Sequence, residues 1–593
     1  MIVLGINEAH NASAAIAVDG EIVAAVQEER FSRIKNHFGV PFKSIDFCLR
    51  FGSFSPKDVD LIVFSGGVPT FLSSLAIARE TSVKTPLFKL LKLGKNTHLA
   101  FRTLILKTEY RLPILRGIDK ITIEPYYKLT QKIFFPKTAK LLEKQFGLDS
   151  KKHTYLNHHT AHTFAALYAS GFTQRFDQIL VVTCDGGGDG LSATVSVFNN
   201  NQLKKIASTS QDNSLGCLYG CITNIMGMNP LEHEYKVMGL APYAEETGTL
   251  SIYAFLKKTI WLDKKSLSFK TIVSSDNLNR YLREHLPRHR FDHLAGAVQR
   301  LTEELLCELI EAAIERTGIG NVVFGGGVAQ NVKANQKIAA LPKVKNFFAM
   351  PSGGDESNAI GAAYWGCQRI NPKIKIKPLK NLYLGPSYEK EQIEKSIKVV
   401  RLGRKYRVRQ LKNPNYEIAQ LLSKGQIIAR FTGRLEFGAR ALGNRSILAD
   451  PTVNDVVNIL NHQIKSRDFW MPFAPSILGT DAKNYLVNPK KLDAPFMTIA
   501  FDTVEKNRHQ LAGAIHPFDK TTRPQILTKE ANPAYYQLIQ YFKKITGRST
   551  ILNTSFNLHG EPIVCSPRDA LETFTKSGLK YLVLENYLVS KND

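Results

Sequence analysis

Two distant segments of this chain repeat one local design, and the repeat limits the folds open to it. In the first segment, the apolar residues 2–6 are followed by the polar stretch 7–13 and by two further apolar runs, 14–18 and 21–26. The last two runs flank Asp19-Gly20, a dipeptide typical of a two-residue hairpin turn. The pattern therefore predicts a strand, a polar loop and a β-hairpin.

The second segment has the same order of features. Residues 178–183 form an apolar run, residues 185–190 read Asp-Gly-Gly-Gly-Asp-Gly, and another apolar run follows at 191–198. Asn199-Asn200-Asn201 then provides a turn. Two copies of the design predict a duplicated α/β architecture whose halves face a cleft.

Four candidate metal ligands lie in three separate segments. His158 and His162 are four residues apart, so on a helix both imidazoles lie on one face. Asp185 and Asp355 each stand beside several glycines, where the backbone can turn tightly and approach a phosphate. Two histidines with carboxylates suit Fe, Mn or Zn. The histidine pair alone could be an ordinary capped helix start, but the two Gly-Asp loops favour a metal site.

Length and composition set outer bounds. At 593 residues the chain is too long to fold around a single hydrophobic core, so two or more domains are expected. No apolar run is long enough to cross a bilayer, and residues 1–5 enter a strand pattern without a basic leader. The seven scattered cysteines include Cys217 and Cys221, but no second pair completes a zinc site. These features predict a cytoplasmic protein in a reducing compartment.

The net charge of +26 is partly local. Residues 84–147 contain 14 Lys and Arg against 4 Asp and Glu, a net of +10, and the basic residues alternate with Leu, Ile, Phe and Tyr. Such a stretch can meet nucleic acid, an anionic membrane surface or a polyanionic substrate. It can equally be the solvated face of ordinary helices. We expect a helical insertion here that borders the cleft.

A long amphipathic helix and a glycine-rich turn are predicted further along the chain. The short apolar run 322–324 and Gly325-Gly326-Gly327 precede Asn331, where another helix is expected. A strand, a glycine turn and a helix N-terminus together form an anion or nucleotide cradle, although a triple glycine can also be a simple tight turn. The long helix is indicated by apolar residues at spacings of three and four, at Leu294, Val298, Leu301, Leu305 and Leu309.

The last third of the chain reads as a separate unit. Residues 372–386 combine Pro-Lys-Ile-Lys-Ile-Lys-Pro with another proline and predict a linker, and residues 387–593 suffice for one further domain. Fixed guanidiniums with Ser and Asn donors fit bidentate recognition of phosphate, whereas one Arg alone is more often part of a surface ion pair. Such residues gather in four segments of this unit, at 430–446, 465–467, 523–525 and 553–557.

Ordered motifs along nearly the whole chain resemble the NodU/CmcH family of O-carbamoyltransferases, which includes nodulation-factor, cephalosporin and tobramycin enzymes. Glu28-Glu29-Arg30-Phe31-Ser32-Arg33 and Glu234-Tyr235-Lys236-Val237-Met238-Gly239-Leu240 are two of them. The others lie at residues 5–13, 157–162, 325–331, 434–451 and 554–562.

The resemblance implies a fold and a reaction. Residues 1–371 would form an actin-like (ASKHA) domain, similar to the tRNA-threonylcarbamoyl transferase subunit, and residues 387–593 a YrdC-like domain. The YrdC-like domain would make carbamoyladenylate from ATP and carbamoyl phosphate. The carbamoyl group would then pass to an acceptor hydroxyl in the metal-bearing domain, with release of AMP.

The resemblance also implies roles for individual residues. His10 would be the general base on the acceptor hydroxyl, which suits a side chain that titrates near neutrality. The implied metal ligands are His158, His162, Asp185 and Asp355, with Fe preferred over Mn or Zn. The implied nucleotide contacts are Lys35, Asp185, Gly216, Gly325, Gly326, Gly327 and Asn331. The implied carbamoyl-phosphate contacts are Arg440, Lys465, Arg523, Asn553 and Ser555.

Three positions depart from the family pattern. Ala439 stands where the family has a proline, a change that loosens a turn and removes no charge. Met471 stands where an Arg is expected, which would remove one phosphate contact. Lys520 replaces the usual glycine after Asp519. All three bear on the details of carbamoyl-phosphate binding.

Three functions are compatible with the sequence. The leading one is an ATP-dependent O-carbamoyltransferase that acts on a sugar, polysaccharide or natural product, without an obligatory nucleic acid and with possible contact to an anionic surface. The second is a tRNA-modifying, threonylcarbamoyl-type transferase, because a charge of +26 suits a polyanion. The third is a non-catalytic nucleotide sensor on an actin-like fold, which the metal-ligand pattern disfavours. The sequence does not identify the acceptor.

Overall fold

The computed structural model describes residues 1–66, 110, 135–399, 405–453, 455–465 and 468–592. Most of the predicted basic insertion at 84–147 therefore lies outside the described residues. Within the described ranges, no helix is both long and apolar enough to cross a membrane.

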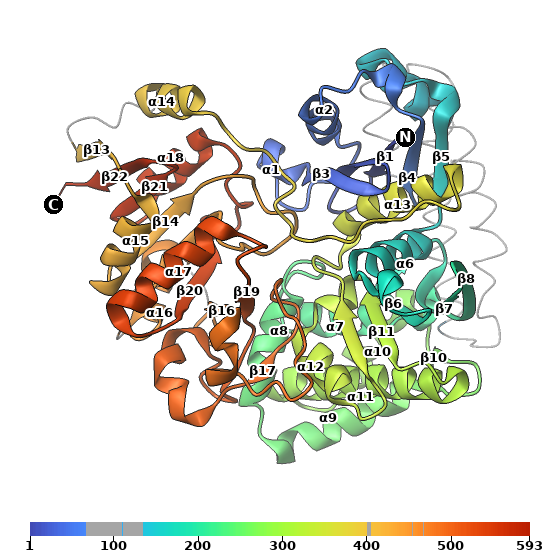
Figure 1. Ribbon diagram of the computed structural model, residues 1–593. Helices are drawn as coiled ribbons and strands as arrows, with labels where there is room; N and C mark the ends of the chain where they lie inside the picture. The colour runs from blue at the N-terminus through green and yellow to red at the C-terminus, as the bar shows by residue number, and fades with distance from the viewer. Residues whose placement is uncertain (67–109, 111–134, 400–404, 454, 466–467, 593) are drawn as a thin grey trace.

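The first predicted hairpin forms part of a five-stranded sheet with the order β3-β2-β1-β4-β5 (Figure 1). Asp19 (φ +47°) and Gly20 (φ +79°) make the predicted turn with left-handed backbones. β1, β2 and β3 pair antiparallel, whereas β4 and β5 continue the sheet parallel to β1. The strands are β1 (Ile2–Asn7), β2 (Ser13–Val18), β3 (Glu21–Gln27), β4 (Leu61–Ser65) and β5 (His153–Leu156).

The second predicted hairpin forms a sheet with the same topology. Its order is β8-β7-β6-β11-β12, with antiparallel β6, β7 and β8 and with β11 and β12 parallel to β6. The matching order and strand directions agree with the predicted duplication. The strands are β6 (Gln178–Gly188), β7 (Leu191–Asn199), β8 (Gln202–Ser210), β11 (Asn321–Gly325) and β12 (Asn346–Ala349).

Two helices, α6 (His158–Ala169) and α13 (Asn358–Ile370), lie between the sheets and share one apolar core with both (Figure 1). Glycine allows their close approach, because a Cβ on Gly361 would lie 1.9 Å from the carbonyl oxygen of Ala161. The helix that carries the candidate histidines is thus fixed from both sides.

The far face of the second sheet is covered by the predicted long helix, α11 (Phe291–Thr317). All five residues of its predicted apolar stripe are buried. The other α-helices and strands described up to residue 371 are α1 (Glu29–Ser32), α2 (Phe42–Phe51), α7 (Leu215–Ile225), α8 (Glu234–Leu240), α9 (Glu246–Thr259), β9 (Ile260–Asp263), β10 (Ser268–Thr271), α10 (Ser275–His285) and α12 (Val332–Ala340).

Residues 372–386 contain no helix or strand, as predicted for a linker, but they are packed rather than free. Ile376, Leu379, Leu382 and Leu384 are buried in the same core as α6 and α13. The Leu435 backbone carbonyl also accepts a hydrogen bond from the Gly385 N–H at 2.9 Å. This segment therefore fastens the C-terminal part to the N-terminal part.

The C-terminal part contains an eight-stranded sheet with the order β13-β22-β21-β14-β15-β20-β16-β19. Its strands are β13 (Tyr406–Gln410), β14 (Ile428–Phe431), β15 (Arg445–Ala449), β16 (Ala474–Leu478), β19 (Gln525–Leu527), β20 (Thr550–Ser555), β21 (Tyr581–Leu584) and β22 (Tyr587–Lys591). A separate ribbon pairs β17 (Phe501–Asp502) with β18 (Thr521–Thr522). The helices are α14 (Lys390–Val399), α15 (Pro414–Ser423), α16 (Val456–Leu460), α17 (Pro533–Thr546) and α18 (Pro567–Lys576).

Candidate functional site

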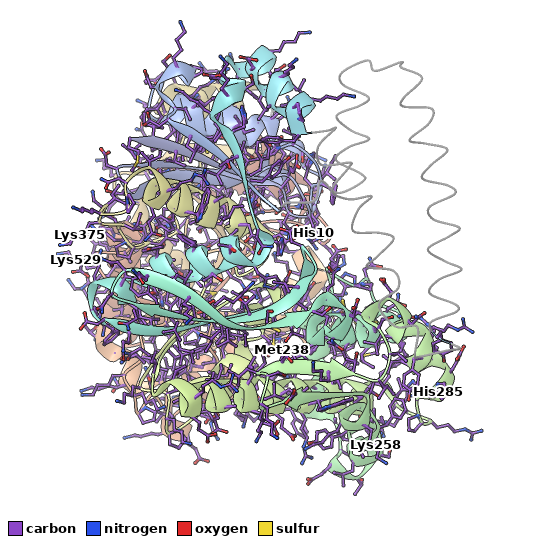
Figure 2. The ribbon with its side chains drawn as sticks, turned by 90° about the vertical axis from the view of Figure 1, so that its right-hand side faces the viewer. His10, Met238, Lys258, His285, Lys375 and Lys529 are labelled. Carbon is purple, nitrogen blue, oxygen red and sulfur yellow. The ribbon has the colours of Figure 1, made fainter. Side chains whose placement is uncertain are left out.

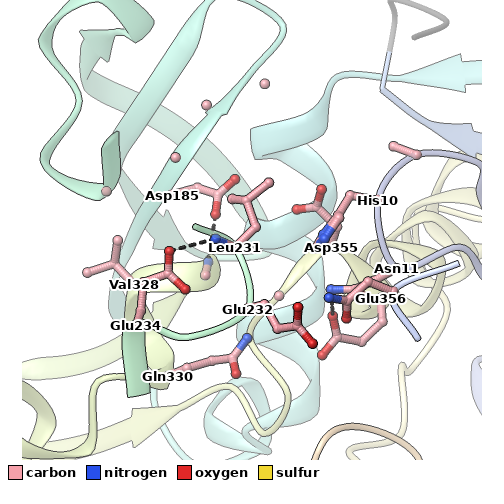
Figure 3. Close-up of a pocket in the computed structure, with 18 of the residues that line it drawn as sticks. His10, Asn11, Asp185, Leu231, Glu232, Glu234, Val328, Gln330, Asp355 and Glu356 are labelled. Carbon is pink, nitrogen blue, oxygen red and sulfur yellow. Dashed lines mark hydrogen bonds between the residues drawn. The ribbon is translucent and has the colours of Figure 1, made fainter. Parts of the chain in front are cut away.

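One large cavity, of about 1780 Å³, is lined by residues of both parts of the chain (Figure 3). Two residues that line the cavity, His10 and Met238, lie toward the middle of the molecule in Figure 2. Lys375 and Lys529, by contrast, lie at the edge of the molecule in this view. The candidate residues in the cavity wall are His10, Lys35, His158, Asp185, Gly216, Gly327, Asn331, Asp355, Arg440, Lys465 and Ser555. The candidates outside its wall are His162, Gly325, Gly326, Arg523 and Asn553.

The four candidate metal ligands meet in space, and one ligand atom from each lies within 4.8 Å of the others. His158 and His162 occupy the first turns of α6, and their Nε2 atoms are 3.1 Å apart. His158 Nε2 lies 3.2 Å from Asp185 Oδ2 and 3.5 Å from Asp355 Oδ1. His162 Nε2 lies 3.5 Å from Asp355 Oδ1. Two imidazole nitrogens and two carboxylates form a donor set that suits Fe, Mn or Zn.

The electrostatics of this cluster favour a positive charge at its centre. Burial lowers the pKa of His158, but Asp355 and Asp185 outweigh it and raise that pKa to about 9. Burial also opposes ionisation of Asp185, yet His158 and His162 hold its pKa well below the usual range. Ionised carboxylates facing two imidazole nitrogens would be neutralised by a bound cation as well as by a proton. The described side chains thus fit a divalent metal.

Backbone structure explains why these segments can come so close. The Asn157 side chain accepts a hydrogen bond from the Thr160 N–H and begins α6 directly before the first histidine. The N–H of Gly327 donates to Asp185 Oδ1 at 2.9 Å. A Cβ on Gly188 would lie 2.3 Å from the His158 ring, so a side chain there would displace the ligand.

The loop that carries His10 is tied to the loop that carries Asp355. The Asn7 side chain donates to the His10 carbonyl at 3.0 Å, and Asn11, with φ +56°, donates to Glu356 Oε2 at 3.4 Å. Figure 3 shows this last bond and His10 in the same wall of the cavity as Asp355. His10 is therefore placed where a general base could face a group held beside the cluster.

Two buried carboxylic acids near this loop were not among the sequence candidates. Burial raises the pKa of Glu8 to about 7, and its Oε2 has no hydrogen-bond partner among the described residues. Burial likewise raises the pKa of Glu356 to about 7, while a hydrogen bond from the Ser352 hydroxyl opposes the shift. Both residues line the cavity. Each stands within two residues of a candidate in sequence, but no local pattern indicates that either side chain is buried.

The candidate nucleotide residues are divided between the cavity and the core. Gly325 and Gly326 serve packing, because a Cβ on Gly326 would lie 2.3 Å from the Cys184 carbonyl oxygen. Gly216 permits α7 to approach β6, since its Cβ would lie 2.7 Å from the Asp185 carbonyl oxygen. Asn331 faces the cavity, but its side chain caps α12.

Lys35, the candidate phosphate contact, lies in the cavity wall and pairs with an acid. Its Nζ is 2.6 Å from Glu232 Oε1, and both side chains are partly exposed. Figure 3 shows Glu232 and Leu231 on the loop that enters the cavity. Leu231 has a left-handed backbone, with φ +66°, and is 67% exposed. A phosphate at Lys35 would therefore compete with Glu232 for the ammonium group.

Three of the candidate carbamoyl-phosphate residues of the C-terminal part, Arg440, Lys465 and Ser555, line the same cavity. Lys465 is buried, and its ammonium donates to the backbone and side chain of Ser555 and to Asn557 Oδ1, the last at 2.7 Å. Asn553 is instead a structural residue, since its amide donates to Ser476 Oγ at 3.0 Å in the sheet.

The structure explains two of the three departures from the family pattern. Met471 is buried against Gly239 of α8, and a Cβ on that glycine would lie 3.0 Å from the Met471 sulfur. This position contributes packing between the two parts of the chain and lies outside the cavity wall. Lys520 has a left-handed backbone, with φ +59°, which accounts for a glycine in the family. Ala439 lines the cavity, and nothing in the structure explains its replacement of proline.

Comparison with known proteins bears on the whole chain. Residues 2–364 match the family model described as carbamoyltransferase N-terminus, and residues 419–591 match carbamoyltransferase C-terminus. An uncharacterized protein of Methanocaldococcus jannaschii is 32% identical over 100% of both chains. Nodulation protein NolNO of Sinorhizobium fredii is 30% identical over 98% of this chain and 79% of its own length. Among solved structures, component A of (R)-2-hydroxyglutaryl-CoA dehydratase from Acidaminococcus fermentans is 15% identical and covers 62% of this chain and 98% of its own, with a TM-score of 0.30.

Proposed function

The chain belongs to the carbamoyltransferase family, and we propose that it is an ATP-dependent O-carbamoyltransferase with carbamoyl phosphate as its donor. Carbamoyl phosphate, ATP and water would give carbamoyladenylate, phosphate and pyrophosphate. An acceptor hydroxyl would then attack the carbamoyl carbon, and AMP would leave. We further propose that residues 1–371 are an actin-like domain, supported by the duplicated sheets, and that residues 387–593 are a YrdC-like domain.

The observation that carries this proposal is the shared cavity. Lys465, Ser555 and Arg440 line its wall and supply hydrogen-bond donors and positive charge, and Lys465 and Ser555 are in contact. His10, His158 and Asp355 lie in another region of the same wall. A donor activated at the first group could therefore reach an acceptor at the second without leaving the protein.

The residues of the second region have complementary tasks in this proposal. His10 would take the proton from the attacking hydroxyl, because a positioned general base contributes on the order of 10²–10⁴-fold to such a step. His158, His162, Asp185 and Asp355 would hold a divalent metal, which supplies positive charge to polarise the carbamoyl carbonyl. Gly188 and Gly327 keep space for this cluster.

The test is an assay of AMP release by the purified protein with ATP, carbamoyl phosphate and a panel of sugars, polysaccharides and hydroxyl-bearing natural products. We expect AMP release that requires both ATP and carbamoyl phosphate and rises with one acceptor class. Threonine-dependent adenylate formation with salt-sensitive tRNA binding would instead support the tRNA-modifying alternative. The family match already favours an enzyme over a non-catalytic sensor.

A further inference from the structure

Gln27 and Arg30, in the N-terminal part, hold the backbone of Gly438 in the C-terminal part. We propose that they are positioning residues, which fix the segment 438–440 so that Arg440 faces the carbamoyl-phosphate site. The inference rests on the proposed role of Arg440. It makes donor activation depend on residues that the sequence assigns to the other half of the enzyme.

Both backbone polar groups of Gly438, the N–H and the carbonyl, form hydrogen bonds with Gln27 and Arg30. Gln27 Oε1 accepts a hydrogen bond from the Gly438 N–H at 3.1 Å, and Arg30 Nη2 donates to the Gly438 carbonyl at 2.6 Å. Arg30 Nη2 also donates to Gln27 Oε1 at 2.9 Å, so the three groups bond one another in a closed ring. Such a ring fixes the direction of the backbone as well as its position.

Gln27 and Arg30, together with the Gly438 backbone that they bond, are called the clamp below. The clamp is buried, so the loss of any one of its hydrogen bonds would be costly. Arg30 is 2% exposed and Gln27 is 4% exposed. Arg30 Nη1 pairs with Glu29 Oε1 at 2.8 Å, so the guanidinium charge is compensated. Gln27 Oε1 accepts hydrogen bonds from both the Gly438 N–H and the Arg30 guanidinium. If this oxygen were removed, both buried donors would lose their acceptor, which is energetically costly.

Gly438 also touches the loop that leads to the metal cluster. Its φ of +97° lies in the left-handed region, and a Cβ there would lie 2.5 Å from Ser352 Cβ. The Ser352 hydroxyl in turn bonds Glu356, the neighbour of Asp355. The segment is therefore fixed against the wall that carries the candidate metal ligands.

The rest of this loop is anchored independently, so the clamp acts on its cavity-facing tip. Glu436 Oε1 accepts hydrogen bonds from the Leu442 and Asn444 N–H groups, both at 2.8 Å, and closes the base of the loop. The Phe437 N–H donates to the Leu382 carbonyl at 2.7 Å. Ala439 and Arg440, which follow Gly438 directly, line the cavity.

The test compares two substitutions of one side chain in the full-length protein. Gln27→Met keeps the shape of the side chain and removes the acceptor oxygen, whereas Gln27→Glu keeps an acceptor oxygen. Lys490→Gln is the matched control, because Lys490 Nζ donates across the two parts to the Leu341 and Val344 carbonyls, both at 2.7 Å, away from the cavity. Carbamoyl-phosphate-dependent exchange of labelled pyrophosphate into ATP is measured without acceptor, so no acceptor needs to be known.

We expect Gln27→Met to raise the KM for carbamoyl phosphate about tenfold or more, with the KM for ATP changed by less than about twofold. Gln27→Glu and Lys490→Gln should stay near the wild type. Hydrogen exchange of the amides at 437–441, followed by mass spectrometry, should accelerate in Gln27→Met and not in Gln27→Glu.

An unchanged KM in Gln27→Met, or an equal defect in Lys490→Gln, would overturn the proposal. Equal hydrogen exchange in the Met and Glu variants would overturn it as well. Absence of pyrophosphate exchange in the wild type would reject the proposed function instead. The exchange of the 437–441 amides would then still decide whether Gln27 holds Gly438.

Discussion

At the scale of single residues, Lys520 carries a measurable strain. Its left-handed backbone (φ +59°) costs an L-residue roughly 1–2 kcal/mol, whereas glycine pays about 0.5–1 kcal/mol in the unfolded chain. We therefore expect Lys520→Gly to stabilise the protein by about 0.5–1 kcal/mol, measured as a higher thermal midpoint. Lys529, an exposed lysine that is absent from the residues with positive φ, is the matched control. Lys529→Gly should lower the midpoint, and an equal gain in both variants would contradict the explanation.

The buried acid Glu8 should make stability depend on pH. Its pKa is raised from 4.5 to about 7 by burial, so between these values the unfolded chain loses the proton while the folded protein keeps it. The free energy of unfolding then falls as pH rises through this window, and above it Glu8 causes no further change with pH. Glu8→Gln removes the effect and should become the more stable protein by up to about 3 kcal/mol above pH 7.

Thermal midpoints of the wild type and Glu8→Gln at pH 5, 6, 7 and 8 would check this expectation. The difference between them should widen with rising pH. Glu505, whose side chain is 89% exposed, provides the control, and Glu505→Gln should show no widening. A constant difference for Glu8→Gln across the range would mean that Glu8 ionises freely in the folded protein.

Some residues of the site could be predicted from the sequence, and others could not. The sequence indicates His158 and His162 because an i, i+4 spacing is a local signal, and Asp355 because two glycines precede it. Glu8 lies in a polar loop, where the pattern predicts exposure. It is nevertheless buried, and its backbone is bonded to a separate loop, because the Gly39 N–H donates to the Glu8 carbonyl at 3.1 Å. Such a long-range contact leaves no local pattern.

At the scale of elements, the four candidate metal ligands join α6, the end of β6 and the turn that begins at Asp355. We expect His158→Ala and Asp355→Ala to lose bound metal, because the remaining ligands hold a cation weakly. Carbamoyladenylate synthesis should survive at least in part, whereas acceptor carbamoylation should be lost. Elemental analysis is the measurement, with the exposed residue His285, as His285→Ala, for comparison.

The same cluster should contribute to stability. A ligand at about one hundred times its Kd stabilises a protein by about 2.7 kcal/mol, so a chelator should lower the thermal midpoint of the wild type. It should leave the midpoint of His158→Ala unchanged. Full metal occupancy in both ligand variants, or an identical response to the chelator, would remove the metal assignment.

The elements themselves were predictable where their signals are local. The turn at Asp19-Gly20 and the apolar stripe of α11 are encoded within a few residues, and the structure confirms both. The order of the C-terminal sheet is not encoded in this way. β15 pairs with β20 although β16 and β19 lie between them in the chain, and only the assembled core selects that pairing. The packed state of residues 372–386 likewise depends on a core that the proline pattern does not indicate.

At the scale of the whole molecule, the proposed function predicts that carbamoyladenylate stays inside one protein between the two steps. His10 and Arg440 line one cavity of about 1780 Å³. In our proposal His10→Asn makes carbamoyladenylate but does not transfer it, and Arg440→Ala transfers the group but cannot use carbamoyl phosphate efficiently. Losing a charged partner of the phosphate costs roughly 1.5–3 kcal/mol.

An equal mixture of the two variants distinguishes internal transfer from release. If the intermediate is retained, the mixture should carbamoylate an acceptor found by the panel assay far more slowly than the wild type, because a released molecule is diluted before it meets the second protein. Arg440→Ala should nevertheless transfer the group from carbamoyladenylate supplied at high concentration, which proves that its transfer site is intact. A mixture that works nearly as fast as the wild type would mean that the shared cavity does not confine the intermediate.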